Sequence, residues 1–410
     1  MDIGQTGQAE IAHSAILAAY NRPMSALSGI TVLEFSRVLA GPWCGMMLAD
    51  LGADVIKLES FDGDDTRGMG PPFDQNGISA YFACCNRNKR SITIDLRAPA
   101  ARPLLEALVR EADVLIENFR TGTAEHLGLD YAELAAINPR LIYCSISGYG
   151  RSGPGADRPG YDYVIQAEGG LMSITGPADG APSKVGVAVV DLATGQNAVI
   201  AILAALRHRD SSGRGQRIDI SLFDTQISWL ANVASSVLFS GEDAPRLGND
   251  HPSIVPYQTF HASDGDFVLA IGSEKLWLQT CAAMGRDDWL RDPRYTNNVT
   301  RVKHRAVLCA EMAQIFSGRE LAHWLALFER IGVPAAPINS VRQALAHPVT
   351  SAHGLRIEVD GVPMIGSPLN FSATPVRYQR PPPRLGEHTE ELVARFGFDS
   401  AALRANGAIR

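Results

Sequence analysis

One carboxylate, Asp191, occupies a position in this sequence where it could either support the fold or react. Residues 187–203 are VAVVDLATGQNAVIAIL, so Asp191 lies between an apolar run and the expected start of an amphipathic helix. Asp is favoured at a helix N-terminus, where its side chain accepts a hydrogen bond from a backbone amide. The same place in an open α/β sheet is also where ligands bind. Composition and periodicity therefore leave two interpretations open, a helix-capping residue and a reactive carboxylate.

Short apolar segments that alternate with helical ones must position this carboxylate. Their Val, Ile and Leu content predicts strands buried on both faces, at residues 30–35, 54–59, 91–96, 113–117 and 141–146, and again in RIDISL. Helices are expected between them, among them one that stops at Gly52. This alternation predicts an α/β fold with a Rossmann-like parallel sheet. SRVLAGPWCG follows the first strand in place of G-x-G-x-x-G, so a nicotinamide cofactor is not expected.

The remainder of the chain predicts a second, smaller α+β domain. It contains a hairpin signal at Asp264-Gly265, a helix that stops at Gly332 and, after it, the hairpin-like stretch VDGVPMIGSP. A long apolar helix is expected at about 224–239, before a Gly- and Pro-containing loop. The expected boundaries are an extension at 1–26, the large Rossmann-like domain at 27–240, a linker at 241–256, the small domain at 257–346, a return linker at 347–389 and a helix at 390–410 that packs on the large domain.

Composition excludes several classes of protein. The 410 residues carry a formal net charge of −7, which gives no basic excess for nucleic acid. The ten histidines show no metal-ligand spacing, and no stretch approaches the ~20 apolar residues of a membrane span. The six cysteines form no C-x-x-C pair, which predicts buried free thiols in a cytoplasmic protein. Cys84-Cys85 has no histidine nearby in the sequence, so a structural role is favoured over a thiol nucleophile.

Several ordered motifs carry a resemblance to a known family. These are LSGITVLEFSRVLAGPWCGMMLADLGADVIKLE, NRNKRSITIDL, DVLIENFR, SGYGRSGPGADRPGYD, VVDLATG, GRGQRIDISLFD, GNDHPSIVPYQTF and RPPPRLGEHT. Together they resemble the family III CoA-transferases from about residue 27 to the C-terminus. The resemblance implies an interlocked homodimer that uses acyl-CoA and a small carboxylic acid as substrates, with no permanently bound cofactor and no metal.

In that family the nucleophile is an aspartate, and Asp191 in VVDLATG matches it. The resemblance implies that Asp191 attacks the thioester to form a mixed anhydride, and that CoA then returns to give an aspartyl-CoA thioester. Splitting one exchange into covalent steps is nucleophilic catalysis. Such a site needs donors for the tetrahedral oxyanion and must exclude water.

Matching the family's motifs also assigns contacts with CoA or substrate. The implied contacts are Leu39, Ala40, Ser60, Ile94, Arg97, Asn118, Phe119, Arg120, His126 and Tyr161. Arg97 and Arg120 would meet the phosphates, although an exposed arginine is as readily a solvated surface charge. His126 stands where several relatives have arginine, and Leu39 where the formyl-CoA branch has glutamine. These differences weigh against formyl-CoA or oxalate as substrates.

Tyr161 separates the two enzymatic branches of this superfamily. The α-methylacyl-CoA racemases have histidine at that position, whereas a tyrosine with a pKa near ~10 is a poor base at neutral pH. We therefore expect CoA transfer, with succinyl-CoA as donor and a dicarboxylic acid as acceptor. A racemase and a non-catalytic CoA-binding protein remain as alternatives.

Overall fold

The structure, a computed structural model of the chain, describes residues 25–410 and divides into two compact units. The first unit comprises the described residues up to Gly169 together with Gly186–Trp229 and Ala352–Arg410. The second unit comprises Gly170–Val185 and Leu230–Ser351. The expected N-terminal extension, residues 1–26, lies almost entirely outside the described residues.

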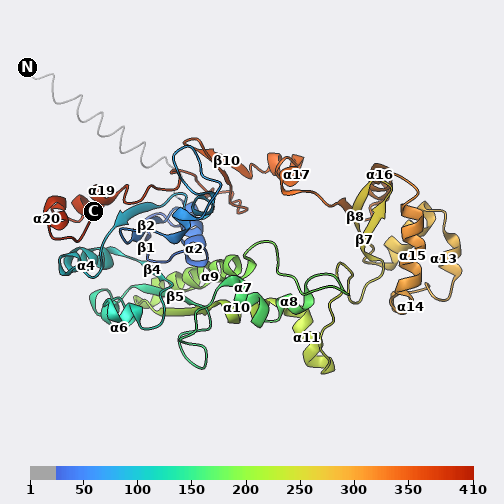
Figure 1. Ribbon diagram of the computed structural model, residues 1–410, viewed down its shortest axis with the longest axis horizontal. Coiled ribbons are helices and arrows are strands. Elements are labelled where there is room, and N and C mark those ends of the chain that lie inside the picture. Colours follow the sequence, from blue (N-terminus) through green and yellow to red (C-terminus); the bar gives the residue numbers. More distant parts are fainter. Residues whose placement is uncertain (1–24) are drawn as a thin grey trace, which may run out of the picture. The chain divides into compact units, whose positions relative to one another are not determined.

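A six-stranded parallel sheet forms the centre of the first unit (Figure 1). Its strands are β1 Thr31–Glu34, β2 Asp54–Glu59, β3 Arg90–Thr93, β4 Val114–Glu117, β5 Ile142–Ser147 and β6 Arg217–Ser221. The spatial order is β3-β2-β1-β4-β5-β6, and every neighbouring pair is parallel. This is the strand order of a doubly wound dinucleotide-binding sheet, so the predicted Rossmann-like fold class is confirmed.

The strands are buried on both faces because helices cover each side. Val32, Val55 and Val114 pack with α2 (Ala40–Asp50) and α9 (Val189–Ser212). Leu33 and Leu115 point to the opposite face, because successive strand residues alternate. That face is covered by α4 (Arg102–Glu111), α6 (Tyr131–Ile137), α19 (Thr389–Arg395) and α20 (Ser400–Ala405). The single helix expected at 390–410 is thus two helices, and these pack on the sheet through Leu392 and Val393 of α19 and Leu403 of α20.

Helix α9 combines unusual length with an apolar composition. Among the described residues it is the one helix long and apolar enough to cross a membrane. Its residues Val199, Ile202 and Leu206 belong to the core that packs against the sheet. These contacts are those of a central core helix, which passes the same length and composition test.

Short elements complete the first unit: η1 Asp65–Gly68, α3 Ala80–Ala83, η2 Pro99–Ala101, α5 Thr123–His126, α7 Asp162–Glu168, α10 Leu222–Trp229, β10 Arg356–Val359 and β11 Val362–Ile365. Strands β10 and β11 form the hairpin that VDGVPMIGSP predicts. Asp360 and Gly361 both have positive φ, 49° and 81°, as a two-residue hairpin turn requires.

The second unit is built around a three-stranded antiparallel sheet with an aromatic core. Its elements are α8 Leu171–Ile174, α11 Ala231–Ser240, β7 Tyr257–Ala262, β8 Gly265–Ala270, α12 Glu274–Ala283, α13 Asp287–Arg291, α14 Asn298–Lys303, α15 Arg305–Phe316, α16 Leu321–Ile331, β9 Ala335–Pro337, α17 Val341–Leu345 and α18 Pro348–Ala352. Trp277 stacks on Trp289 at 5.7 Å in its core. The predicted hairpin is present, but its turn is Ser263-Asp264, one residue before the expected Asp264-Gly265, because Gly265 already pairs with Ala262 as the first residue of β8.

The single helix expected at 224–239 is wrong. Helix α10 ends at Trp229 and α11 begins at Ala231, whose φ is 42°. The segment contains neither Gly nor Pro, so nothing local announces the break. The interruption falls where the chain leaves the first unit and enters the second. The cause therefore lies in the tertiary structure, which helical periodicity in the sequence does not reveal.

Candidate active site

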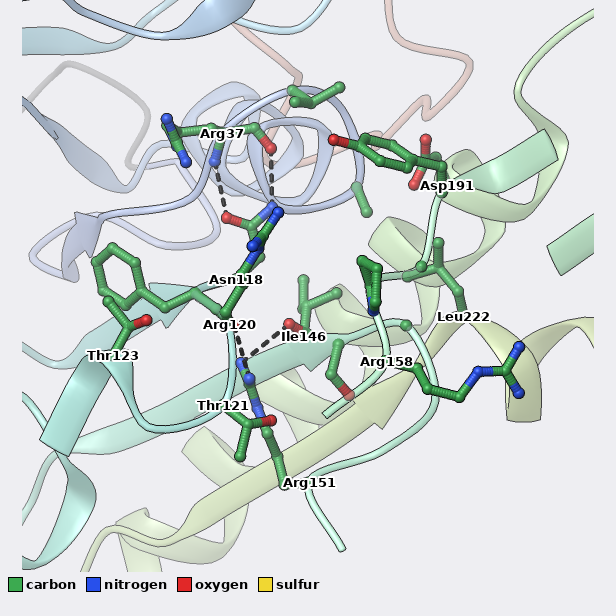
Figure 2. Close-up of a pocket in the computed structure, with 18 of the residues that line it drawn as sticks. Arg37, Asn118, Arg120, Thr121, Thr123, Ile146, Arg151, Arg158, Asp191 and Leu222 are labelled. Carbon is green, nitrogen blue, oxygen red and sulfur yellow. Dashed lines mark hydrogen bonds between the residues drawn. The ribbon is translucent and has the colours of Figure 1, made fainter. Parts of the chain in front are cut away.

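A cavity of about 330 Å³ opens at the carboxyl ends of β1, β4 and β5 (Figure 2). Strands β1 and β4 are spatial neighbours although they are not consecutive in the chain, so the loops that follow them diverge there. Open α/β sheets bind ligands at such a switch point. The cavity is lined by Arg37, Val38, Leu39, Ala40, Asp65, Asn118, Phe119, Arg120, Thr121, Thr123, Ile146, Ser147, Gly148, Arg151, Ala156, Asp157, Arg158, Pro159, Gly160, Tyr161, Asp191 and Leu222.

Asn118 joins the two diverging loops. Its Oδ1 accepts a hydrogen bond from the Arg37 amide at 2.9 Å, and its Nδ2 donates to the Arg37 carbonyl at 2.8 Å (Figure 2). The side chain thus replaces a strand neighbour for Arg37, just beyond the end of β1. Asn118 therefore fixes the position of the cavity wall through both the oxygen and the nitrogen of its side-chain amide.

Asp191 is the third residue of α9 and does not cap it. The residue at the N-cap position is Ala188, which has no side chain to accept a bond. The Asp162 carboxylate does the capping: its Oδ2 accepts from the amides of Val190 at 2.8 Å and Asp191 at 3.3 Å. The capping interpretation of Asp191 is therefore wrong. Its carboxylate has no hydrogen bond or ion pair with any described residue.

Burial and a neighbouring charge change the acidity of Asp191. Loss of hydration is the larger cause and the Asp162 carboxylate the second, and together they raise the pKa of Asp191 from its ordinary value near 4 to about 7. Asp162 is itself held by Gln166, whose Nε2 donates to Oδ1 at 2.6 Å. A carboxylate of higher pKa is more basic and a stronger nucleophile once ionised. The arrangement thus provides a partly buried, uncompensated carboxylate that faces a cavity.

Two close backbone approaches bring these elements together. A Cβ at Gly195, one turn after Asp191, would lie 2.6 Å from the Ala40 carbonyl oxygen and 3.1 Å from the Trp43 ring. Glycine there lets α9 lie against the beginning of α2. A Cβ at Gly148 would lie 2.6 Å from the Gly160 Cα, so two glycines allow the loop after β5 to fold onto itself. Asp162 follows directly and is thereby carried to the start of α9.

Sequence analysis missed three arginines of the cavity wall. Arg151 donates to Ser145 Oγ at 2.7 Å and pairs with Glu117 at 3.0 Å, and Arg158 pairs with Glu168 at 2.6 Å. Arg37 lies 3.3 Å from Asp65. Arg151 and Arg158 belong to the Gly- and Pro-rich stretch YGRSGPGADRP, which was a signal for a functional loop. Glu117, the partner of Arg151, is the last residue of β4, and Asp65, the partner of Arg37, lies after β2, so the pairs could not be predicted from local sequence.

The cavity brings together many of the residues assigned by motif but not all. Its wall includes Leu39, Ala40, Asn118, Phe119, Arg120, Tyr161 and Asp191. The Arg120 guanidinium has no hydrogen bond or ion pair with a described residue, so its charge is available. Ser60, Ile94, Arg97 and His126 lie outside the wall. Ile94 is buried and bridges to Ile409, whereas Arg97 is exposed and pairs with Asp95 at 3.2 Å. Ser60 and His126 are exposed.

Tyr161 lies at the mouth of the cavity rather than in the core. Its side chain is 65% exposed, and its hydroxyl has no partner among the described residues. Tyr161 is therefore not a buried aromatic residue with a satisfied hydroxyl. The cavity wall contains no histidine among the residues that the structure describes.

The cysteines lie away from the cavity wall. Cys44, Cys85, Cys144, Cys281 and Cys309 are buried free thiols, as expected. Cys84 is exposed, which corrects the expectation of burial for this residue. Cys84 directly follows the short helix α3, and its side chain points outward, whereas the side chain of Cys85 points inward. Among the described residues no group of His, Cys, Asp and Glu side chains is arranged to hold a metal ion.

Comparison with known proteins identifies the family to which this chain belongs. Residues 27–389 match CoA-transferase family III, so the chain belongs to that family and is a CoA-transferase. The resemblance found in the sequence is confirmed.

Similar proteins cover nearly the whole chain. The chain is 47% identical to a succinate–glutarate CoA-transferase of Agrobacterium fabrum, over 90% of this chain and 95% of that protein. It is 40% identical to the mouse succinyl-CoA:glutarate CoA-transferase, over 93% of this chain and 88% of that protein. A crystal structure of a CAIB/BAIF family protein from Brucella suis superposes with a TM-score of 0.84 at 46% identity, over 91% of this chain and all of that one.

Proposed function

We propose that this CoA-transferase moves CoA from succinyl-CoA to a dicarboxylic acid such as glutarate, with Asp191 as the nucleophile. The names of the similar enzymes from Agrobacterium fabrum and mouse support this pair of substrates. The observation that carries the mechanism is the position of Asp191, a cavity-lining carboxylate whose hydrogen-bonding capacity no described residue uses. A carboxylate that served only the fold would have a partner.

The proposed reaction has four acyl-transfer steps. An Asp191 carboxylate oxygen attacks the thioester carbon, the C–S bond breaks, and CoA leaves as thiolate. The thiolate attacks the Asp191 carbonyl carbon of the anhydride, which releases succinate and leaves an aspartyl-CoA thioester. The acceptor carboxylate attacks that thioester and expels CoA again. The thiolate then attacks the acceptor's carbonyl carbon, which frees Asp191 and gives the new acyl-CoA without any net change in protons or electrons.

The cavity wall supplies what these steps require. Among the described residues no side chain accepts a bond from the amides of Ala40 and Gly41 at the start of α2, and Pro42 has no N–H. These two amides, of which Ala40 belongs to the cavity wall, are free to donate to a developing oxyanion. Asp162 fixes the amide of Asp191 and keeps its carboxylate basic. Leu39 and Leu222 line the wall and reduce the access of water to the anhydride.

CoA extends beyond this cavity, because about 330 Å³ is at the small end of ligand pockets. In our proposal Arg120 meets a CoA phosphate with its unpaired guanidinium, beside Asn118 and Phe119. The implied contacts that lie outside the wall, Ser60, Ile94, Arg97 and His126, would then bind the nucleotide end. The exposed Tyr161 would contact the acyl or pantetheine portion.

We also propose that the active form is a homodimer. Helix α11 exposes Leu238 and Phe239 by 84% and 94%, which is unusual for large apolar side chains of one helix. A second copy of the chain that covers this helix would remove them from water. Sedimentation of an active monomer would contradict the dimer.

A racemase is the alternative that fits least well. Asp191 with a pKa near 7 could accept an α-proton, but the position that carries histidine in racemases carries Tyr161 here. Deuterium uptake at the α-carbon of an acyl-CoA in D₂O, without CoA transfer, would favour it. An Asp191→Ala protein that still binds CoA and keeps its full cellular function would favour a purely binding role.

The proposal is tested by incubating the protein with succinyl-CoA and each of a panel of acids, including glutarate, mesaconate and citramalate. Mass spectrometry of the products shows which acid receives CoA. Hydroxylamine added during turnover should convert Asp191 into a hydroxamate, while Asp65 and Asp157, the other carboxylates of the cavity wall, stay unmodified. Transfer to no acid would remove the substrate assignment, and transfer without modification of Asp191 would remove the nucleophile.

A further inference from the structure

Two lysines in the interior of the first unit have no part in the proposed chemistry. Lys57 and Lys89 are 1% and 0% exposed. Lys57 Nζ lies 3.0 Å from Glu34 Oε1 and 2.9 Å from Asp64 Oδ2, and Lys89 Nζ lies 2.8 Å from Glu34 Oε2. These four residues form a buried charge network of two cations and two carboxylates.

Such a network is weak evidence for stability, because removing four charges from water is costly. Well-packed apolar residues of similar volume often do as well or better. A buried ionic cluster is retained more readily where it fixes one particular conformation. The backbone groups that it holds therefore indicate its role.

The buried charge network holds the turn between β1 and α2. Lys57 Nζ donates to the Ser36 carbonyl at 2.8 Å, and Lys89 Nζ donates to the Pro42 carbonyl at 2.8 Å. Asp64 Oδ1 accepts from the Val38 amide at 3.3 Å, between those two anchors. The four residues from Arg37 to Ala40, which lie inside these anchors, all line the cavity that contains Asp191.

Val38 is the strained point of this turn. Its φ is 71°, in the left-handed region that a β-branched residue very rarely adopts. Such a conformation persists only where the surroundings impose it, and it is found preferentially at functional sites. The Asp64 carboxylate meets the backbone at this residue.

The charges of Asp64 and Lys57 are present at neutral pH. Burial by itself would raise the pKa of Asp64, but the Lys57 ammonium and the amide and hydroxyl of Thr66 outweigh burial and lower it to about 2. Burial opposes the charge of Lys57 too, yet the carboxylates of Glu34 and Asp64 raise its pKa above the ordinary value. The carboxylate at position 64 is thus ionised and held in place from one side by Lys57.

We propose that Asp64, held by Lys57, is a positioning residue for CoA transfer: it keeps Val38 in the left-handed conformation and so sets the cavity wall at residues 37–40. The inference rests on the transferase activity of the family, and not on Asp191 being the nucleophile. A wall displaced at Val38 moves the bound thioester relative to the reacting groups. Misplacement of that kind lowers the rate even when the groups themselves are intact.

The test compares Asp64→Ala in two backgrounds, the natural Val38 and Val38→Gly. Glycine adopts a φ of 71° without strain, so the wall then needs Asp64 less. We expect Asp64→Ala to lower kcat/KM for the acyl-CoA by about tenfold or more with Val38, and by less than about threefold with glycine. The KM for the acceptor acid should change less than the KM for the acyl-CoA. Thr66→Val is the matched control, because it removes the Thr66 hydroxyl bond to Asp64 and leaves the Val38 contact in place.

A purely structural role gives a different pattern. Asp64→Ala would then lower the free energy of unfolding by the same amount in both backgrounds. Its effect on the kinetic constants of the folded protein would not depend on residue 38. Equal losses of kcat/KM in the two backgrounds, or unchanged kinetics in a folded Asp64→Ala protein, would overturn the proposal. If Asp64→Ala does not fold, Asp64→Leu in the Val38, Val38→Ala and Val38→Gly backgrounds carries the same test, because leucine fills the space of the carboxylate but cannot accept from the Val38 amide. Alanine at position 38 keeps the strain and glycine relieves it. Failure of the natural protein to transfer CoA from succinyl-CoA would instead concern the proposed substrates, before any variant is compared.

Discussion

The carboxylate of Asp162 holds the backbone of Asp191: its Oδ2 lies 2.8 Å from the amide of Val190 and 3.3 Å from that of Asp191. One contact therefore does two things. It caps helix α9 in place of Asp191, and it puts a negative charge beside the Asp191 carboxylate. The proposed nucleophile is thus left free of hydrogen bonds by the residue that also makes it more basic.

Asp162→Asn should separate these two effects. Asparagine keeps an oxygen for the amides of Val190 and Asp191 but removes the charge, so the pKa of Asp191 should fall. Burial, the larger cause, remains, and the pKa should stay above its ordinary value. The test is the pH profile of kcat/KM, whose acidic limb should move to lower pH in the variant. An unmoved limb would mean that Asp162 does not set the acidity of the group that limits turnover.

The transfer reaction should itself depend on the ionisation of Asp191. With a pKa of about 7, the nucleophile is protonated below pH 6 and ionised above pH 8, so kcat/KM should rise through this range and then level off. Asp191→Asn should lower kcat by about 10³-fold or more, as removal of a nucleophile commonly does. Asp157→Asn, another carboxylate of the cavity wall, is the control and should keep the same profile. A flat profile from pH 5 to 9 with the natural residue would contradict this assignment.

Sequence patterns were sufficient for the parallel sheet and for the position of Asp191, because both depend on local signals. Continuous apolar runs identify the strands. Asp191 was identified by the motif VVDLATG, but the expected strand before it is absent, because residues 181–188 form neither helix nor strand and α9 begins at Val189. The roles within the site were less accessible. The bond from Val190 and Asp191 to Asp162 joins positions almost thirty residues apart, and the pair of Arg151 with Glu117 joins the loop after β5 to the end of β4. Pairings of this kind depend on strand order, which the amino-acid pattern does not specify.

The same limit explains the break between α10 and α11. Residues 224–239 contain neither Gly nor Pro, so periodicity predicts one helix. The chain instead passes from one compact unit to the other at this point. Left-handed Val38 is a comparable case, since no local pattern predicts positive φ at a valine. Departures from local preference of this kind are expected at functional and strained positions.

Stability should depend on pH through Asp191. The unfolded chain releases this proton near pH 4 and the folded protein near pH 7, so between these values the unfolded state is favoured as pH rises. The natural protein should therefore lose stability from pH 4 to pH 7, relative to Asp191→Asn, and the difference should stay constant above pH 7. About three pH units correspond to at most about 4 kcal/mol, and we expect about 1–4 kcal/mol since the carboxylate is partly exposed. Denaturant unfolding of both proteins at pH 5 and pH 8 measures it, and an equal difference at the two pH values would contradict the raised pKa.

Gly195→Ala tests whether the close contact between α9 and α2 is needed for activity. The added Cβ would lie 2.6 Å from the Ala40 carbonyl oxygen, which is backbone and cannot rotate away, so the two helices must separate. Overpacking of this kind costs about 1–3 kcal/mol of stability. The separation should also move Asp191 relative to the beginning of α2 and lower kcat by about tenfold or more.

Gly186→Ala is the matched control, because a Cβ there meets nothing within 4 Å and its φ is not positive. If Gly195→Ala loses stability but keeps the kcat of the control, the contact serves the fold alone, and the α2 amides have no part in stabilising the oxyanion.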